Sequence, residues 1–127
     1  MLEQHKEKKT ILIVDDEADI CAILKRAIDH NGFVASSFTD PTLALQHISL
    51  EPARYDIVVS DVRMPTMSGF ELARQIKRIN PKIKLVIMTA FDINKSEFDA
   101  VLPNSAFEGF LTKPVSAAKL VSVLDDL

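Results

Sequence analysis

Residues 11–17, Ile-Leu-Ile-Val-Asp-Asp-Glu, decide the fold class that we predict for this chain. Four consecutive apolar residues predict a short strand that is buried on both of its faces. Two carboxylates, Asp15 and Asp16, follow directly where this strand ends. A strand covered on both faces is typical of a parallel sheet with helices on either side.

The rest of the chain alternates strand and helix patterns in the same way. Further strands are predicted at residues 33–38, 57–60, 85–89 and 109–112. The first helix is expected to bury one apolar stripe, made of Ile20, Ile23, Leu24, Ala27 and Ile28, and to end at Asn31-Gly32. Later helices are predicted after the N-cap residues Asp40, Ser68, Asn94 and Ser116, the fourth helix spanning about 94–102. This is the pattern of an α/β fold of the flavodoxin type, a doubly wound five-stranded parallel sheet of order 2-1-3-4-5 with about five helices.

Length and composition describe one globular unit. The 127 residues are near the commonest domain size, with residues 1–9 expected as a flexible lead-in and 10–127 as the domain. A net charge of −3 predicts no basic surface for nucleic acid. The basic cluster Lys77, Arg78, Lys82 and Lys84 is interpreted as a solvated face, with docking of a partner as the alternative. No apolar run is long enough to span a membrane. A single cysteine, Cys21, fits a structural thiol in a reducing, cytoplasmic setting.

Polar side chains gather at the carboxyl ends of the predicted strands. Asp15 and Asp16 follow the first strand, Asp61 the third, Thr89 ends the fourth, and Lys113 follows the fifth. These ends converge in a doubly wound sheet, so the five residues are expected to share a site. Two unit charges about 4 Å apart repel by about 4 kcal/mol at an effective dielectric of about 20, so three carboxylates favour a hard cation such as Mg²⁺. A carboxylate beside such a metal can attack phosphorus, which predicts phosphoryl transfer onto an aspartate.

Four motifs, in this order and spacing, resemble the receiver domain of bacterial response regulators. They are ILIVDDE at 11–17, DVRMPTMSG at 61–69, MTA at 88–90 and FLTKP at 110–114. The resemblance covers the chain from about Thr10 to its end. It implies a two-component signalling domain rather than an enzyme, with a sensor histidine kinase or a histidine phosphotransfer protein as phosphoryl donor.

The resemblance also implies a metal site and an acceptor. Asp61 would accept the phosphoryl group, and Mg²⁺, with Mn²⁺ as an alternative, would be bound by Asp16, Asp61 and the backbone carbonyl of Arg63. Asp15 would help through a water molecule.

The remaining implied roles concern the response to phosphorylation. Thr89 and Lys113 would contact the phosphoryl oxygens, and Lys113-Pro114 would be a cis peptide. Phe110 would be the switch aromatic that rotates inward when Thr89 moves, changing the surface of the fourth helix, fifth strand and fifth helix. A core aromatic is the alternative interpretation of Phe110. The implied output is binding of an unidentified protein target, as a monomer or a phosphorylation-dependent homodimer.

Two segments depart from the family pattern. Phe107-Glu108-Gly109 stands where many receivers have Ala-Gly-Ala, and Pro103-Asn104-Ser105 would shorten the fourth helix. We further hypothesise that Phe91 shields the phosphoryl group from hydrolysis.

Other functions on a similar architecture are less consistent with the residues. A non-phosphorylated pseudo-receiver that acts as an interaction module remains the main alternative. A phosphatase of the haloacid dehalogenase type needs Asp-x-Asp after its first strand, whereas Asp61 precedes Val62-Arg63. Nucleotide binding lacks a glycine-rich motif in a chain with 3 glycines.

Overall fold

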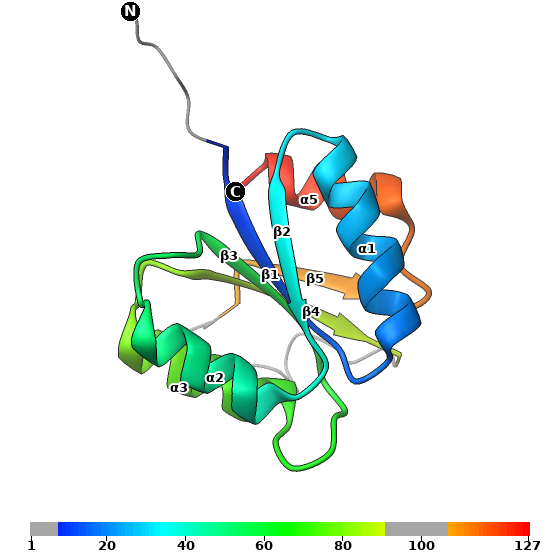
Figure 1. Cartoon of the computed structure of the whole chain (residues 1–127). Helices are drawn as coiled ribbons and strands as arrows, with labels where there is room; N and C mark the ends of the chain where they lie inside the picture. The colour runs from blue at the N-terminus through cyan, green and yellow to red at the C-terminus, as the bar shows by residue number, and fades with distance from the viewer. Residues whose placement is uncertain (1–7, 91–106) are drawn as a thin grey trace, which may run out of the picture.

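Five parallel strands form the centre of the molecule. The computed structural model describes residues 8–90 and 107–127. Its strands are β1 (Thr10–Val14), β2 (Val34–Phe38), β3 (Ile57–Asp61), β4 (Lys84–Thr89) and β5 (Gly109–Thr112). They pair in the order β2-β1-β3-β4-β5, which confirms the predicted topology (Figure 1).

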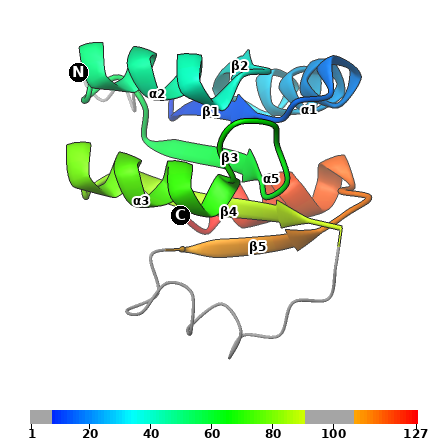
Figure 2. The ribbon, with the colours of Figure 1, turned by 90° about the horizontal axis from the view of Figure 1, so that it is seen from below.

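In the described parts of the chain, four helices cover the two faces of this sheet. They are α1 (Ala18–His30), α2 (Pro41–Leu50), α3 (Gly69–Ile79) and α5 (Ala117–Asp125). The view in Figure 2 shows α1 and α5 on one face and α2 and α3 on the other. The fourth helix expected at 94–102 lies outside the described residues, as do Phe91 and Pro103-Asn104-Ser105.

Side chains of the strands alternate between two separate hydrophobic cores. Leu12 and Val14 pack with α2 and α3, whereas Ile11 and Ile13 pack with α1 and α5. The same alternation continues along β3 and β4. This explains the unbroken apolar runs, because both faces of each central strand are covered.

The buried face of α1 is rotated relative to the predicted stripe. Cys21, Leu24 and Ile28 are buried, whereas Ile23 is 61% exposed and the expectation for that residue was wrong. The Cys21 thiol donates a hydrogen bond to the carbonyl oxygen of Asp15 at 3.3 Å, so the helix turns this side toward the end of β1. Ile23, which directly precedes the buried Leu24, faces solvent instead.

The helix boundaries follow the predicted capping residues. The Asp40 carboxylate accepts a hydrogen bond from the Thr42 N–H at 2.8 Å, and the Ser68 hydroxyl accepts one from the Glu71 N–H at 3.2 Å. Ser116 caps α5 in the same way. Gly32 ends the turn after α1 with a φ of 88°, a conformation that glycine adopts without strain.

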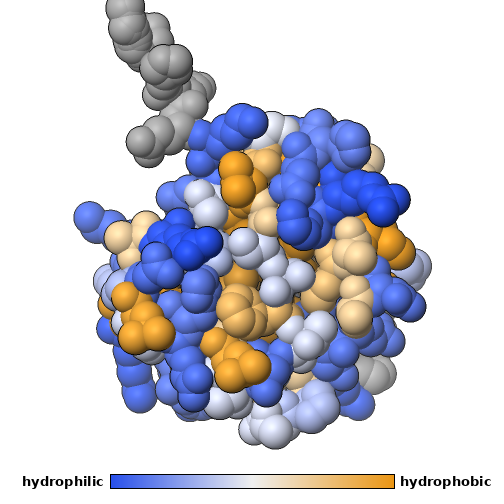
Figure 3. Space-filling view, viewed as in Figure 1, coloured by the Kyte–Doolittle hydropathy of each residue, from blue (hydrophilic) through white to orange (hydrophobic). Residues whose placement is uncertain are grey.

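Several hydrophobic side chains are exposed on the surface of the described residues. The large ones are Ile23, Val34, Leu43, Leu50 and Phe110. Figure 3 shows hydrophobic residues interrupted by hydrophilic ones across the face seen there. Within the described ranges 8–90 and 107–127, no helix has the length and hydrophobicity needed to cross a bilayer.

The first residue of α3 is in direct contact with the end of β3. The Gly69 N–H donates a hydrogen bond to the Val62 carbonyl at 2.8 Å. A Cβ on Gly69 would lie 2.0 Å from the carbonyl oxygen of Asp61 and 3.1 Å from the Cα of Val62. Both of these atoms belong to the backbone, so no side-chain rotation can make room. Glycine at this position therefore allows α3 to pack against the segment that carries Asp61.

Substituting this glycine tests the close approach. Gly69→Ala should lower the free energy of unfolding by about 2 kcal/mol, because the added methyl must displace the backbone. Urea denaturation measures the effect. Gly32→Ala is the control, since nothing lies within 4 Å of its Cβ and only its positive φ is strained. A Gly69→Ala variant as stable as the wild type would contradict the proposed packing.

Candidate functional site

Three carboxylates meet at the carboxyl ends of β1 and β3. These strands are neighbours, so Asp15 and Asp16 after β1 lie beside Asp61 at the end of β3. One carboxylate oxygen from each lies within 4.8 Å of the others. Asp15 is fully buried, Asp61 is 8% exposed, and Asp16 is open to solvent. The predicted acidic cluster is therefore formed, with one open side.

Lys113 provides the positive charge of this cluster. Its Nζ lies 3.0 Å from Asp15 Oδ2 and 3.4 Å from Asp61 Oδ2. Its backbone N–H donates to the Thr89 carbonyl at 2.7 Å, which ties the end of β5 to the end of β4. The Lys113-Pro114 peptide is cis, as expected.

Burial and neighbouring charges shift the pKa of two residues of the cluster, Asp61 and Lys113. Burial, together with the charge of Asp15, raises the pKa of Asp61 above its ordinary value, although Lys113 acts in the opposite direction. Burial by itself would lower the pKa of Lys113, because it disfavours the charged form. The hydrogen bond and charge of Asp15, with the charge of Asp61, outweigh this and raise the pKa of Lys113. Lys113 is thus held in its charged form.

The three carboxylates differ in the hydrogen bonds that their other oxygens accept. Asp15 Oδ1 accepts a hydrogen bond from the Glu17 N–H, and Asp61 Oδ1 accepts one from the Val62 N–H, both at 2.9 Å. Within residues 8–90 and 107–127, the Asp16 carboxylate has no hydrogen-bond or ion-pair partner. Three carboxylates and one ammonium leave a net charge of −2 when all are ionised. This negative, oxygen-lined group has the donor chemistry of a Mg²⁺ site.

A cleft of about 330 Å³ opens beside the cluster. Its lining residues are Asp16, Glu17, Asp61, Val62, Arg63, Thr89, Ala90 and Lys113. Thr89 ends β4 and is buried, so the structure brings all five strand-end residues of the prediction to one place. Glu17 was not predicted as a lining residue. The only sequence signal for it is its position directly after the two aspartates.

Phe110 lies on the neighbouring strand β5 and is 41% exposed. Its ring centroid is 5.7 Å from that of Phe107, and the Phe107 ring is 5.9 Å from that of Phe70 in α3. The alternative interpretation of Phe110 as a core aromatic is therefore wrong. Phe107 takes the buried position instead and connects β5 to the first turn of α3. Phe107 departs from the family pattern, but no sequence signal predicts its contact with Phe70.

Comparison with known proteins gives consistent results. A model of the response regulator receiver domain matches residues 11–125. The response regulator receiver protein CpdR of Brucella abortus is 29% identical over 119 residues, which cover 94% of this chain and 96% of CpdR. The C4-dicarboxylate transport transcriptional regulatory protein DctD of Rhizobium meliloti is 31% identical over 112 residues. These cover 88% of this chain but 24% of DctD, so the chain spans about a quarter of that relative.

A solved structure shows the same architecture. The crystal structure of a response regulator receiver domain protein from Clostridium thermocellum superposes with a TM-score of 0.82 at 25% identity. The superposition covers 93% of this chain and 92% of the other. The family match over 11–125 and the acidic cleft agree with this result, and the chain belongs to the response regulator receiver domain family.

Proposed function

We propose that Asp61 accepts a phosphoryl group from a phosphohistidine of a sensor kinase or a histidine phosphotransfer protein. The observation that carries this proposal is the placement of Asp61 between two further carboxylates and Lys113 at the mouth of one cleft. A carboxylate oxygen of Asp61 would attack phosphorus. The phosphorus–nitrogen bond would break, and the imidazole of the donor would leave with its electron pair.

The contacts of Asp61 support its role as the nucleophile. The Val62 N–H fixes Oδ1, and the Lys113 ammonium lies near Oδ2, so the side chain is oriented before the donor arrives. Asp15 is less suited, because it is fully buried and both of its oxygens already accept hydrogen bonds. Asp16 is accessible but exposed, with no group that orients it among the described residues.

We propose Asp16, Asp61 and the Arg63 carbonyl as Mg²⁺ ligands, with Asp15 contributing through water and Mn²⁺ as an alternative ion. The all-oxygen donor set, the net negative charge and the open side at Asp16 fit a cation that retains water molecules. Bound Mg²⁺ would neutralise charge on the carboxylates and on the incoming phosphoryl oxygens.

Thr89 and Lys113 are proposed to hold the transferred group. Both line the cleft that contains Asp61. The Lys113 ammonium would exchange part of its interaction with Asp61 for a phosphoryl oxygen, and the Thr89 hydroxyl would donate to another. Movement of Thr89 would be coupled to inward rotation of Phe110, whose ring is partly exposed in this conformation and packs against Phe107.

An apolar groove beside the cleft suits the protein that donates the phosphoryl group. The groove has a volume of about 390 Å³, and its lining residues are Glu17, Ile20, Ile23, Leu24, Met88, Lys113, Pro114 and Val115. Glu17 and Lys113 line the acidic cleft as well, so the two hollows adjoin. A protein whose histidine enters the acidic cleft on the side of Glu17 and Lys113 would cover this groove. We propose that the donor packs on the exposed side chain of Ile23.

The acceptor assignment is tested by mass. Wild-type protein incubated with acetyl phosphate and Mg²⁺ should gain one phosphoryl group, and Asp61→Asn should gain none. Asp125→Asn, which alters an exposed carboxylate on α5, serves as the matched control and should still be modified. Folded protein that stays unmodified, even with phosphohistidine donors, would instead favour the non-phosphorylated interaction module.

Metal binding is tested separately by thermal unfolding. A concentration of Mg²⁺ at about ten times its dissociation constant should add about 1.4 kcal/mol and raise Tm by several degrees. Asp16→Asn should abolish this rise, because it removes the open carboxylate, whereas Asp125→Asn should retain it. Equal Mg²⁺ stabilisation in all three proteins would contradict a site at Asp16.

The docking groove is tested by comparing two donors. Ile23→Glu should slow phosphorylation by a phosphorylated histidine phosphotransfer domain about tenfold, because it places a charge in an apolar contact. Phosphorylation by acetyl phosphate should be unchanged, since that donor needs no protein contact. Leu43→Glu on α2, also an exposed apolar residue, is the control. An equal loss in both variants, or a loss with acetyl phosphate, would contradict docking at Ile23.

A further inference from the structure

A third hollow lies at the opposite end of the sheet, where β1, β3 and β4 begin. Its volume is about 410 Å³, within the range of small-molecule sites. Its lining residues are Lys8, Lys9, Thr10, Ala53, Arg54, Asp56, Ile57, Lys82, Lys84 and Leu127. Five of these residues have positively charged side chains and one has a negatively charged side chain, although the side chains of the whole chain sum to a net charge of −3. The positive charge is therefore concentrated locally.

The single acidic side chain of this basic pocket, Asp56, is hydrogen-bonded to the backbone. Asp56 Oδ2 accepts a hydrogen bond from the Thr10 N–H at 2.9 Å, and the Asp56 N–H donates to the Thr10 carbonyl at the same distance. The Asp56 carbonyl also accepts from the Lys84 N–H at 3.0 Å. Asp56 thus joins the starts of three strands, and it does not pair with the surrounding cations.

Most of the cations have no competing partner. Within residues 8–90 and 107–127, the side chains of Lys8, Lys82 and Lys84 form no hydrogen bond or ion pair. The other two cations are engaged. Lys9 Nζ donates to the main-chain oxygen of Leu127 at 2.8 Å, and Arg54 pairs with Glu51 at 3.0 Å.

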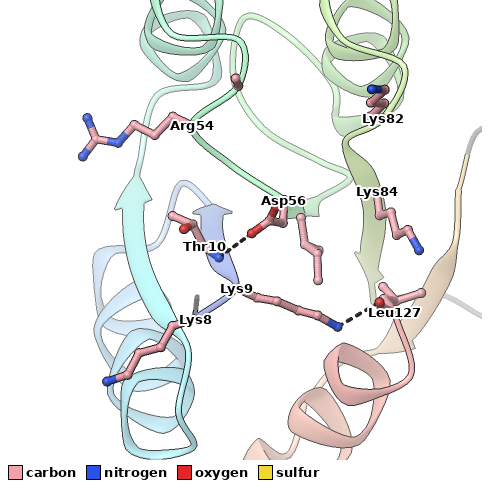
Figure 4. A pocket seen from close by; sticks show the side chains of 10 residues that line it. Lys8, Lys9, Thr10, Arg54, Asp56, Lys82, Lys84 and Leu127 are labelled. Atoms are coloured by element: carbon pink, nitrogen blue, oxygen red, sulfur yellow. Dashed lines mark hydrogen bonds between the residues drawn. The ribbon is translucent and has the colours of Figure 1, made fainter. Parts of the chain in front are cut away.

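The cationic groups are spaced around the pocket rather than gathered at one point. Figure 4 shows Lys9 and Lys84 extending toward the Leu127 side, Lys82 above them, and Lys8 and Arg54 on the other side. A single small anion could not contact all of them. A ligand with several linked anionic groups could, because it would offer one group to each cation in turn.

We propose that this basic pocket binds an oligophosphate, such as the phosphate chain of a nucleoside polyphosphate. Lysine ammonium groups bind phosphate as point charges and need no fixed geometry, which suits flexible side chains around an open pocket. Nucleic acid fits less well, because an extended duplex or strand needs a basic stripe and the positive charge here is confined to one end of the sheet. The pocket is remote from Asp61, so the proposal does not depend on phosphorylation.

Binding is tested with sodium tripolyphosphate on the whole chain. The titration is followed by amide resonances, in the absence of divalent cations so that the acidic cluster does not bind phosphate through a metal. The expected shifts are at Lys9, Thr10, Asp56 and Lys84. Lys84→Glu should weaken binding about tenfold, because it replaces attraction by repulsion. Lys119→Glu, an equal charge change at an exposed position on α5, should alter affinity by less than about twofold.

Three outcomes would overturn the assignment. Equal weakening by Lys84→Glu and Lys119→Glu would mean a response to net charge rather than a site. Shifts centred on Asp16 and Lys113 would move the ligand to the acidic cleft. Binding of a polyglutamate peptide without binding of tripolyphosphate would assign the pocket to an acidic protein segment. ATP that binds more tightly than tripolyphosphate would support the proposal and add contacts from the nucleoside.

Discussion

The ion pairing of Lys113 with Asp15 and Asp61 is the interaction on which the rest of the site depends. Asp15 is fully buried, and a buried carboxylate without a cation is strongly destabilising. Its partner comes from the far end of the sequence, so the cluster exists only when β1, β3 and β5 are all in place. The backbone hydrogen bond from Lys113 to Thr89 fixes the cation relative to β4. Sheet assembly and site assembly are therefore the same event.

Sequence patterns predicted most of the fold because the central strands are covered on both faces. A short unbroken apolar run such as 11–14, followed at once by carboxylates, is typical of a strand buried in this way, and the capping residues Asp40, Ser68 and Ser116 mark helix starts through local hydrogen bonds. The direction in which a helix packs is not local. Periodicity placed Ile23 inside and Cys21 beside the stripe, whereas the contact of the Cys21 thiol with the end of β1 reverses them. Residue spacing alone cannot resolve a rotation of one position.

The strand-end rule likewise predicted Asp15, Asp16, Asp61, Thr89 and Lys113, because it depends only on strand direction. The need for glycine at position 69 could not be derived in this way, since it arises from the distance between two backbone segments. The basic pocket is a similar case. Lys82 and Lys84 were interpreted as a solvated face, because nothing in the sequence places them beside Lys8 and Lys9. Only the pairing of β3 with both β1 and β4 brings these residues together.

The acidic cleft and the basic pocket lie at opposite ends of the same strands, which limits how strongly they can influence each other. β3 begins directly after Asp56 at the pocket and ends with Asp61 at the cleft, and its 5 residues span about 17 Å. This distance is about twice the Debye length at physiological ionic strength, so direct interaction between charges at the two ends is largely screened. β3 is paired on both sides and buried along its whole length, which leaves little room for bending. A ligand in the basic pocket could therefore be bound while Asp61 is phosphorylated, and any coupling would have to pass through the helices and loops that connect the strands.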